Sequence, residues 1–384
     1  MLGTCPTGSR KRCPPYGERM TDSDRRARFV EEIRRGAPLS DELAHAFATV
    51  PREAFVVDGF QDRGGRWTRP GDRGFLDAVY RDDVLVTKVE GRIPFSSSSQ
   101  PSLMAVMIHA LEVEPGMRVL EIGAGTGYNA ALLATLGASV ISVDVQADVA
   151  ERAARCLTEA GITGVRVEHG DGYAGAPGHR FDRVIVTVGV AGLSPRWLSQ
   201  LDPGGIAVVP VEHAGTHPVL AVRGSADGPV TASVVSPSGF MSASGPLTAE
   251  HQFSHPPPAA SGELGVLREV TGPRFDPPLG ALSYRDLWYA AGVWHRRATH
   301  AAIRGVDQNC LVLLDETRTG GAAILPDGAI LTGGAEPERW AHDAADILKR
   351  WDAAGRPSMQ AWQVTLALTG LPEAPIWVPA SWSL

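Results

Sequence analysis

The sequence has few cysteines and no dense basic cluster. Its 384 residues include Cys5, Cys13, Cys156 and Cys310, and none of them shows the CxxC spacing of zinc sites and dithiol redox centres. We therefore expect free thiols, no metal site and a reducing compartment, the cytoplasm. The 36 basic and 43 acidic residues give a net charge of −7, whereas nucleic-acid-binding domains are usually strongly basic. Nucleic acid is not expected as a partner.

Long apolar runs are also missing. No stretch of about 20 apolar residues could cross a membrane. Arg10-Lys11-Arg12 is followed by Cys13-Pro14-Pro15 and not by the apolar core of a signal peptide. We expect a soluble chain with no membrane segment. Hydrophobic residues still make up 43% of the sequence, enough for a substantial core, and this length favours two domains.

Strand and helix patterns alternate in the middle of the chain. Short β-branched runs at 118–122, 139–143, 165–169, 182–188 and 206–211 are separated by stretches with helical periodicity. This order predicts an α/β fold with a doubly wound parallel sheet, the Rossmann-like arrangement.

The rest of the chain divides into a leader and two flanking regions. We expect residues 1–22 to be a disordered leader, residues 23–100 to form helices and a substrate loop, and residues 101–240 to form the Rossmann-like domain. Pro, Ser and Gly become frequent between residues 230 and 262, which indicates a boundary. Residues 245–384 are expected to form an additional C-terminal α+β domain with a role in peptide recognition.

A glycine-rich turn follows the first central strand. In Glu121-Ile122-Gly123-Ala124-Gly125-Thr126-Gly127-Tyr128 the glycines allow a sharp turn and a close approach to a ligand, where a Cβ would clash. The GxGxG spacing differs from the GxGxxG fingerprint of dinucleotide sites. The carboxylate of Glu121 would repel a pyrophosphate but suits a cationic centre such as a sulfonium. The three glycines and this carboxylate therefore indicate S-adenosyl-L-methionine and not NAD.

Further carboxylates follow or begin the neighbouring strands. Asp144 lies 21 positions after Gly123 (144 − 123), where a carboxylate can accept hydrogen bonds from both ribose hydroxyls. Asp171 and Gly172 follow the third strand and are placed to meet an adenine edge. Asp182 begins the fourth strand, and we interpret it as a structural cap. Their order and spacing support the same cofactor site.

Segments on both sides of the glycine turn carry a family resemblance. They are Val50-Pro51-Arg52-Glu53-Ala54-Phe55-Val56, Ala78-Val79-Tyr80-Arg81-Asp82, Ser99-Gln100-Pro101, Gly170-Asp171-Gly172 and Leu201-Asp202-Pro203-Gly204-Gly205. With the glycine turn, they make residues 118–211 resemble a class I S-adenosylmethionine-dependent methyltransferase. The stretch 25–235 resembles the protein-L-isoaspartate O-methyltransferase family, and the segments ahead of the glycine turn point to that family.

The resemblance implies methyl transfer to the carboxylate of an aspartyl or isoaspartyl residue in a peptide. The motif serine of the family corresponds to Ser99, which would lie near the methyl group and the carboxylate. We expect Ser98, Gln100 and Thr187 to bind the same carboxylate. After the serine the family has Ala-Pro-His, whereas this chain has Gln100-Pro101-Ser102, so the preference for isoaspartate over aspartate stays open.

This reaction needs few catalytic groups. A carboxylate with a pKa near ~4 is already ionised at neutral pH, so no general base is required. No His/Asp pair or Ser-His-Asp arrangement is recognisable near the cofactor motifs. Alignment of the oxygen, the methyl carbon and the sulfur can supply roughly 7–11 kcal/mol. The ester would then let the neighbouring backbone nitrogen attack and form a succinimide (aspartimide).

Two competing motifs carry less weight. The pairs His213/His217 and His251/His255 have i,i+4 spacing, but prolines follow them and no third ligand is apparent, which argues against a metal. Asp276-Pro277-Pro278-Leu279 is similar to a motif of amino-methylating nucleic-acid enzymes, but it lies outside the predicted sheet.

The chain continues well beyond the Rossmann-like sheet, and this length favours a dedicated peptide partner. It resembles bacterial family members associated with lanthipeptides, lasso peptides and graspetides, in which one Asp is methylated and becomes aspartimide or isoaspartate. We expect the C-terminal domain to hold the precursor peptide near Trp288, Trp294 and Trp340. Taken singly, each of these tryptophans is more often a core residue. The alternatives are repair of isoaspartyl residues in damaged proteins, a small-molecule or nucleic-acid methyltransferase, and a non-catalytic binding module.

Overall fold

The computed structural model of the chain describes residues 21–62, 64–91, 93–223, 229–248, 267–303, 309–315 and 320–384. Residues 1–20 of the expected leader lie outside these ranges. Residues 21 and 22 begin the first helix, where the Thr21 side chain accepts a hydrogen bond from the backbone N–H of Asp24, as an N-cap does.

The helices and strands of the described residues have the following bounds. The α-helices are α1 (Asp22–Gly36), α2 (Asp41–Thr49), α3 (Phe75–Val79), α4 (Pro101–Leu111), α5 (Tyr128–Thr135), α6 (Ala147–Glu159), α7 (Pro195–Gln200), α8 (Ala281–Trp294) and α9 (Pro337–Ala353). The 3-10 helices are η1 (Arg52–Phe55), η2 (Gly172–Ala174), η3 (Gly245–Leu247) and η5 (Met359–Ala361). The strands are β1 (Phe60–Gln61), β2 (Trp67–Thr68), β3 (Leu85–Glu90), β4 (Ile93–Ser98), β5 (Arg118–Ile122), β6 (Ser139–Asp144), β7 (Val165–His169), β8 (Phe181–Val186), β9 (Leu201–Pro210), β10 (Val219–Arg223), β11 (Thr231–Ser236), β12 (Arg268–Thr271), β13 (Ala298–Ala302), β14 (Asn309–Leu314), β15 (Gly321–Ile324), β16 (Ile330–Gly333), β17 (Gln363–Leu371) and β18 (Ala374–Ser383).

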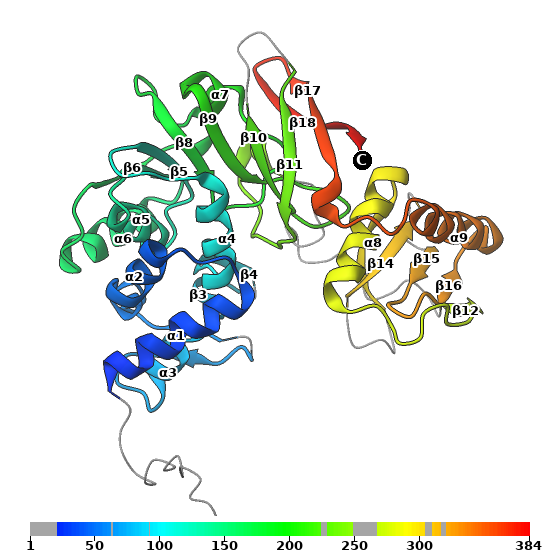
Figure 1. Cartoon of the computed structure of the whole chain (residues 1–384), viewed down its shortest axis with the longest axis horizontal. Helices are drawn as coiled ribbons and strands as arrows, with labels where there is room; N and C mark the ends of the chain where they lie inside the picture. Colours follow the sequence, from blue (N-terminus) through cyan, green and yellow to red (C-terminus); the bar gives the residue numbers. More distant parts are fainter. Residues whose placement is uncertain are drawn as a thin grey trace, which may run out of the picture.

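A nine-stranded sheet forms the centre of the fold (Figure 1). Its strand order is β18-β17-β11-β10-β9-β8-β5-β6-β7. The five strands from β5 to β9 run parallel, and the other four continue the sheet in antiparallel pairs. The chain starts in the middle of the parallel part and winds outward in both directions. The predicted doubly wound sheet is therefore confirmed.

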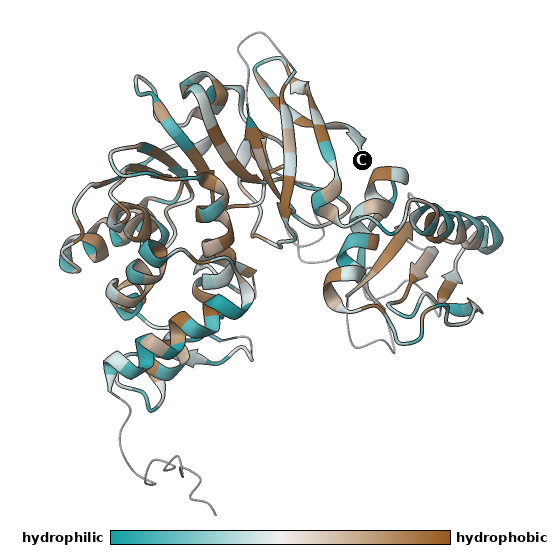
Figure 2. Cartoon of the chain, viewed as in Figure 1, coloured by the Kyte–Doolittle hydropathy of each residue, from teal (hydrophilic) through white to brown (hydrophobic). Residues whose placement is uncertain are grey.

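The parallel strands are buried on both faces. In β5, Val119 packs into the core on one face and the next residue, Leu120, into the core on the other, because successive side chains of a strand point to opposite faces. Val184, Ile185 and Val186 in β8 are all fully buried. This explains why these strands read as continuous apolar runs, and Figure 2 shows the hydrophobic colour along them.

The N-terminal region packs against one face of the sheet. Phe47 from α2 and Phe55 from η1 contact the ring of Tyr128, the first residue of α5. A small sheet with the order β2-β1-β3-β4 extends from this region. Its last strand, β4, leads directly into α4, which begins with Pro101 at its first position, a favoured place for proline. This connection brings the serine run of residues 96–99 to the carboxyl ends of the parallel strands.

The C-terminal region forms a lobe with a five-stranded sheet, order β12-β16-β15-β14-β13, packed against α8 and α9 (Figure 1). A hairpin with Pro326-Asp327-Gly328 in its turn joins β15 to β16. The sequence placed all of residues 245–384 in one domain, but β17 and β18 return to the central sheet. Thr365 pairs with Thr231 of β11, and Val364 and Leu366 are buried, so this hairpin covers a sheet edge that would otherwise be open.

The tryptophans of the C-terminal lobe belong mainly to its core. Trp288 and Trp340 are only 3% and 5% exposed, so the expectation that they grip a peptide is wrong. Trp294 packs edge-on against Trp362, with the guanidinium of Arg350 at 4.7 Å from its ring centre.

No helix in the described residues has the length and apolar character needed to span a bilayer.

Candidate active site

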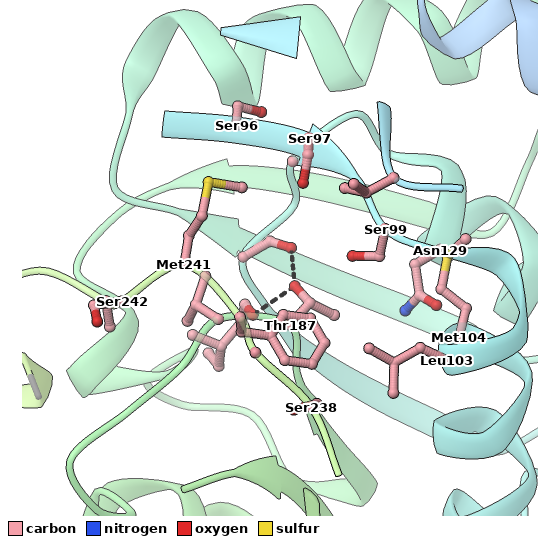
Figure 3. A pocket seen from close by; sticks show the side chains of 18 of the residues that line it. Ser96, Ser97, Ser99, Leu103, Met104, Asn129, Thr187, Ser238, Met241 and Ser242 are labelled. Atoms are coloured by element: carbon pink, nitrogen blue, oxygen red, sulfur yellow. Dashed lines mark hydrogen bonds between the residues drawn. The ribbon is translucent and has the colours of Figure 1, made fainter. Parts of the chain in front are cut away.

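A cavity of about 1550 Å³ opens at the carboxyl ends of β5, β6 and β8. In a doubly wound sheet, this edge is where ligands bind. The glycine turn and the ends of β6 and β8 form one side of the cavity, and the serine run of β4 faces them (Figure 3). Residues 235–248, which include the end of β11 and the segment after it, form a further wall.

The glycine turn is shaped to bring backbone against the cavity. Gly123 and Gly125 have φ values of 96° and 54°, in the left-handed region that favours glycine. A Cβ on Gly123 would lie 2.7 Å from Oγ1 of Thr187, and one on Gly125 would lie 3.0 Å from the carbonyl oxygen of Ser97. Gly127 has another role, because it caps α5 and packs against Ala153 of α6 outside the cavity wall.

Asp144 lies in the cavity wall at the end of β6. Its Oδ2 accepts a hydrogen bond from the backbone N–H of Gly125 at 3.1 Å, and its Oδ1 accepts one from Gln146 at 3.0 Å. The side chain is mostly buried, and this burial raises the pKa of its carboxyl group. Because each carboxylate oxygen has a second lone pair, Asp144 can still accept hydrogen bonds from two ribose hydroxyls.

Asp171 and Gly172 lie on the same side of the cavity. The Asp171 side chain accepts a hydrogen bond from the backbone N–H of Tyr173 at 2.9 Å and so caps η2. A Cβ on Gly172 would lie 2.8 Å from the side chain of Ile122. The positions predicted for the adenine edge are thus brought next to the glycine turn.

Glu121 is fully buried below the cavity and not in its wall. Its carboxylate accepts hydrogen bonds from Oγ of Ser142 and, at 2.8 Å, from Nδ2 of Asn129. Burial raises the pKa of Glu121 to about 7. Glu121 therefore reaches the cavity only through Asn129, which lines it (Figure 3). The sequence reasoning missed Asn129, whose only signal was its place two residues after the last glycine.

The serine run alternates between two environments. Ser96 and Ser98 are buried, whereas Ser97 and Ser99 are partly exposed, as expected from the two faces of a strand. In Figure 3 the hydroxyls of Ser97 and Ser99 point into the cavity. The structure gives the Ser99 hydroxyl no hydrogen bond to another described residue, so it can bind a ligand. Ser97 was not predicted as a site residue.

The other predicted carboxylate-binding residues are already engaged within the chain. Thr187 donates its hydroxyl proton to the carbonyl oxygens of Gly123 at 2.6 Å and Ile122 at 3.1 Å. Gln100 donates from Nε2 to Oδ2 of Asp82 at 3.0 Å. The Ser98 hydroxyl lies on the buried side of the strand. The Ser98 oxygen accepts hydrogen bonds there from Arg52 at 3.4 Å. Of the four predicted residues, Ser99 alone has a partly exposed hydroxyl with no hydrogen bond to another described residue.

None of the described residues of the competing motifs lines this cavity. Nε2 of His213 lies 2.8 Å from the carbonyl oxygen of Tyr289, and burial lowers its pKa to about 4, as for a neutral core histidine. His251 and His255 lie outside the described residues. Asp276-Pro277-Pro278-Leu279 precedes α8 in the C-terminal lobe. Asp182 accepts a hydrogen bond from the backbone N–H of Arg118 at 2.8 Å, which agrees with its interpretation as a cap.

Together, the fold and the donor side of the cavity define a class I S-adenosyl-L-methionine-dependent methyltransferase. A model of the family described as protein-L-isoaspartate(D-aspartate) O-methyltransferase matches residues 24–247. The chain belongs to this family.

Several curated relatives are named protein-L-isoaspartate O-methyltransferase. The one from Gloeobacter violaceus is 38% identical over 227 residues, which cover 59% of this chain and 98% of the relative. The one from Thermotoga maritima is 39% identical over 177 residues, which cover 45% of this chain and 51% of the relative. The match thus spans only about half the length of the Thermotoga protein.

A solved structure of a protein-L-isoaspartate O-methyltransferase is similar over most of the chain. It is 26% identical, with a TM-score of 0.53, and the match covers 93% of this chain and 99% of the other. A C-terminal region of this kind therefore also occurs in a solved protein of that name. The length of this chain is therefore no evidence for a dedicated peptide partner.

Proposed function

We propose that this methyltransferase esterifies the carboxylate of isoaspartyl residues in peptides and damaged proteins. One observation carries the proposal: the free hydroxyl of Ser99 faces the glycine turn across a single cavity. Both the donor and a carboxylate need to occupy such a cavity at once. The names of the relatives, and the family model that spans the sheet and the serine run, support the same reaction.

The donor side fits S-adenosyl-L-methionine. Asp144 would accept hydrogen bonds from the ribose, Asp171 and Gly172 would meet the adenine, and the tight glycine turn leaves room for the rest of the molecule. When bound, this group supplies a methyl carbon on a sulfonium, and that carbon–sulfur bond breaks as the carboxylate oxygen bonds to the methyl carbon. Tyr128, the first residue of α5, follows the turn directly and packs against Phe47 of the N-terminal region.

The acceptor side has to bind and orient an anion. The Ser99 hydroxyl would donate a hydrogen bond to one carboxylate oxygen and leave the other free to react. Because a carboxylate is already ionised at neutral pH, no residue of the chain has to remove a proton. The contribution of the protein is orientation and exclusion of water. This agrees with a cavity in which Ser99 supplies a donor and no basic residue is needed.

The ester has a better leaving group than the free acid. The backbone nitrogen of the following residue can attack the ester carbonyl, lose its proton and expel methanol, which gives a succinimide. Hydrolysis of the succinimide yields aspartyl and isoaspartyl products. Repeated cycles would thus return part of an isoaspartyl population to aspartate.

A pair of isomeric peptides tests the proposal. Two hexapeptides that differ only in an isoaspartyl or an aspartyl residue are incubated with the full chain and methyl-labelled S-adenosyl-L-methionine. Volatile methanol released by base measures the ester. We expect ester on the isoaspartyl peptide and less than about a tenth as much on the aspartyl one, a difference of about 1.4 kcal/mol. Equal ester on both peptides would reject the isoaspartyl preference.

A second candidate is methylation of one Asp in a ribosomally made peptide. Two observations favour it. First, the hydrogen bond from Gln100 to Asp82 distinguishes this serine loop from the family pattern. Second, the cavity is larger than the usual 300–1,000 Å³ of small-molecule sites and has room for a constrained peptide. A cyclised Asp-containing precursor peptide, assayed as a third substrate, would decide between the two candidate functions. A kcat/KM above that of the isoaspartyl peptide would favour this candidate.

The C-terminal lobe is proposed to contribute to acceptor recognition through different residues from those expected. Leu282, at the start of α8, and Gln360, in η5, both line the cavity. Leu282 is 73% exposed, which is unusual for a leucine at a cavity wall and suits contact with an apolar acceptor side chain. We also propose a cytoplasmic location, supported by Cys156, which is buried and forms no disulfide within the described residues.

A further inference from the structure

Arg52 is a completely buried arginine behind the serine run. It begins η1, directly after Pro51, and its side chain is 0% exposed. Its guanidinium carbon lies 5.8 Å from the ring centres of both Phe29 and Tyr128. Arg52 is absent from the cavity wall, so it cannot touch a substrate there.

The guanidinium of Arg52 binds backbone carbonyls from two separate segments. Nη1 donates to the carbonyl oxygens of Val79 and Arg81, both at 2.9 Å. Nη2 donates to the carbonyl oxygens of Asp83 at 2.9 Å and Ser99 at 3.0 Å. The planar fork of an arginine can make such bonds in fixed directions. One side chain thus joins residues 79–83 to the residue whose hydroxyl faces the cavity.

Asp82, from the same segment, holds the other side of Ser99. Its Oδ1 accepts a hydrogen bond from the backbone N–H of Ser102 at 2.7 Å, and its Oδ2 accepts one from Gln100 at 3.0 Å. These contacts secure the start of α4, whose N-cap residue Gln100 makes no side-chain cap of its own. Asp82 also lies outside the cavity wall.

Ser99 itself lies beyond the sheet ladder. The last pair of β3 and β4 joins Leu85 to Ser98, and α4 begins only at Pro101. No ladder hydrogen bond therefore fixes the Ser99 peptide, and its carbonyl oxygen is held by Arg52. The orientation of its hydroxyl depends on contacts from residues far away in the sequence.

We propose that Arg52 and Asp82 are positioning residues, which set the orientation of the Ser99 hydroxyl in the cavity without touching either substrate. The catalytic part of this inference rests on the proposed function, because it assumes that Ser99 binds the acceptor carboxylate. Displacement of a reacting group by about 1 Å can cost on the order of 100-fold in rate. A loop held by Arg52 and Asp82 avoids that loss.

The first variant is Arg52→Lys, which keeps the buried charge but cannot reach four carbonyls in one plane. Hydrogen–deuterium exchange of the full chain is expected to rise about tenfold at residues 97–102 and to stay unchanged at residues 118–135. With an isoaspartyl peptide, kcat is expected to fall by about 10- to 100-fold. The affinity for S-adenosyl-L-homocysteine is expected to stay within about twofold, because the donor side is untouched.

A second variant and a matched control accompany the first. Asp82→Asn places an amide against the Gln100 amide and is expected to lower kcat by about 3- to 10-fold, with faster exchange again confined to residues 97–102. Arg26→Met removes an arginine of the same region that binds Tyr80 and Glu53 and not the serine run. Its kcat is expected to match the wild type.

Two outcomes would overturn the proposal. One is wild-type exchange at residues 97–102 in Arg52→Lys together with wild-type kcat. The other is faster exchange that spreads equally over residues 22–60 and 118–135, with a parallel loss of donor affinity, which would show a purely structural role. If the wild type binds S-adenosyl-L-homocysteine but esterifies no peptide, the proposed function fails, and the exchange at residues 97–102 still decides whether Arg52 and Asp82 fix the serine run.

Discussion

The donor side and the acceptor side of the cavity are built in different ways. The donor side comes mainly from residues 118–146, a strand, a glycine turn, a helix and the next strand in direct succession, and Asp171 and Gly172 after β7 complete it. The acceptor side is assembled from η1, residues 79–83, the serine run and residues 235–248. A site made by neighbours in sequence is specified by spacing alone, whereas a site made by distant segments depends on packing.

This difference separates the effects expected of mutations. A change on the donor side should alter donor affinity and leave acceptor chemistry intact, and a change on the acceptor side should do the reverse. Variants on each side of the cavity, each with a matched control, test that separation.

The Asp144→Ala variant should abolish most donor binding. Loss of a carboxylate that accepts two hydrogen bonds costs about 3 kcal/mol, so the affinity for S-adenosyl-L-homocysteine should fall roughly 100-fold in calorimetry. Asp148→Ala, an exposed carboxylate nearby that pairs with Lys88, is the matched control, with an expected change below about threefold. Equal effects of the two variants would break the assignment of Asp144.

Glu121→Gln should change how stability depends on pH. The pKa of Glu121 is about 7 in the folded protein against 4.5 in the unfolded chain. Because the folded state holds its proton longer, stability from this group falls as pH rises from about 4.5 to 7 and is constant above that. The free energy of unfolding of the wild type, relative to the variant, should therefore drop by roughly 3 kcal/mol over this window.

Urea unfolding of both proteins at pH 4.5 and pH 8 measures this difference, and other titrating groups cancel in the comparison. A difference between wild type and variant that does not change with pH would show that the Glu121 carboxyl titrates normally. It would also show that the donor side is more open to water than its burial indicates.

Ser99→Ala should lower kcat about 30-fold, since one hydrogen bond to a charged group contributes about 2 kcal/mol. Donor affinity should be unchanged, which is the reverse of the Asp144 result. Ser199→Ala changes an exposed serine in α7 whose hydroxyl donates to the carbonyl oxygen of Arg196, and it controls for the substitution itself. Steady-state kinetics with an isoaspartyl peptide provides both numbers, and a joint loss of donor affinity would contradict the separation.

Leu282→Ala should have the smallest effect. Loss of part of the apolar contact between Leu282 and an acceptor side chain costs about 1 kcal/mol. For peptides with an apolar residue beside the isoaspartyl residue, KM should therefore rise about fivefold, whereas kcat should stay the same. Leu371→Ala, an exposed leucine of β17 that is not in the cavity wall, is the control. An unchanged KM would remove the C-terminal lobe from acceptor recognition.

The same contrast explains what the sequence could predict. The doubly wound parallel sheet, the glycine turn and the position of Asp144 follow from local periodicity and spacing, and the structure brings them together as expected. The directions of the Glu121 and Thr187 side chains could not be predicted from periodicity and spacing. Glu121 ends a buried strand and points to Ser142 and Asn129, and the Thr187 hydroxyl is used by backbone carbonyls.

Long-range contacts were beyond sequence reasoning. Arg52 appeared only as part of a motif, because its partners lie 27 to 47 residues away. The return of β17 to the central sheet and the burial of Trp288 and Trp340 likewise depend on how distant segments pack. No periodicity within a short window contains that information.

The most direct test measures base-labile ester on an isoaspartyl peptide over time, with the full chain and S-adenosyl-L-methionine. Mass spectrometry then quantifies the methylated peptide and the S-adenosyl-L-homocysteine formed. We expect one methyl ester for each S-adenosyl-L-homocysteine formed, and a loss of both at low donor concentration in Asp144→Ala. A wild-type chain that binds S-adenosyl-L-homocysteine yet forms no ester on any carboxyl group of the peptide would contradict this expectation.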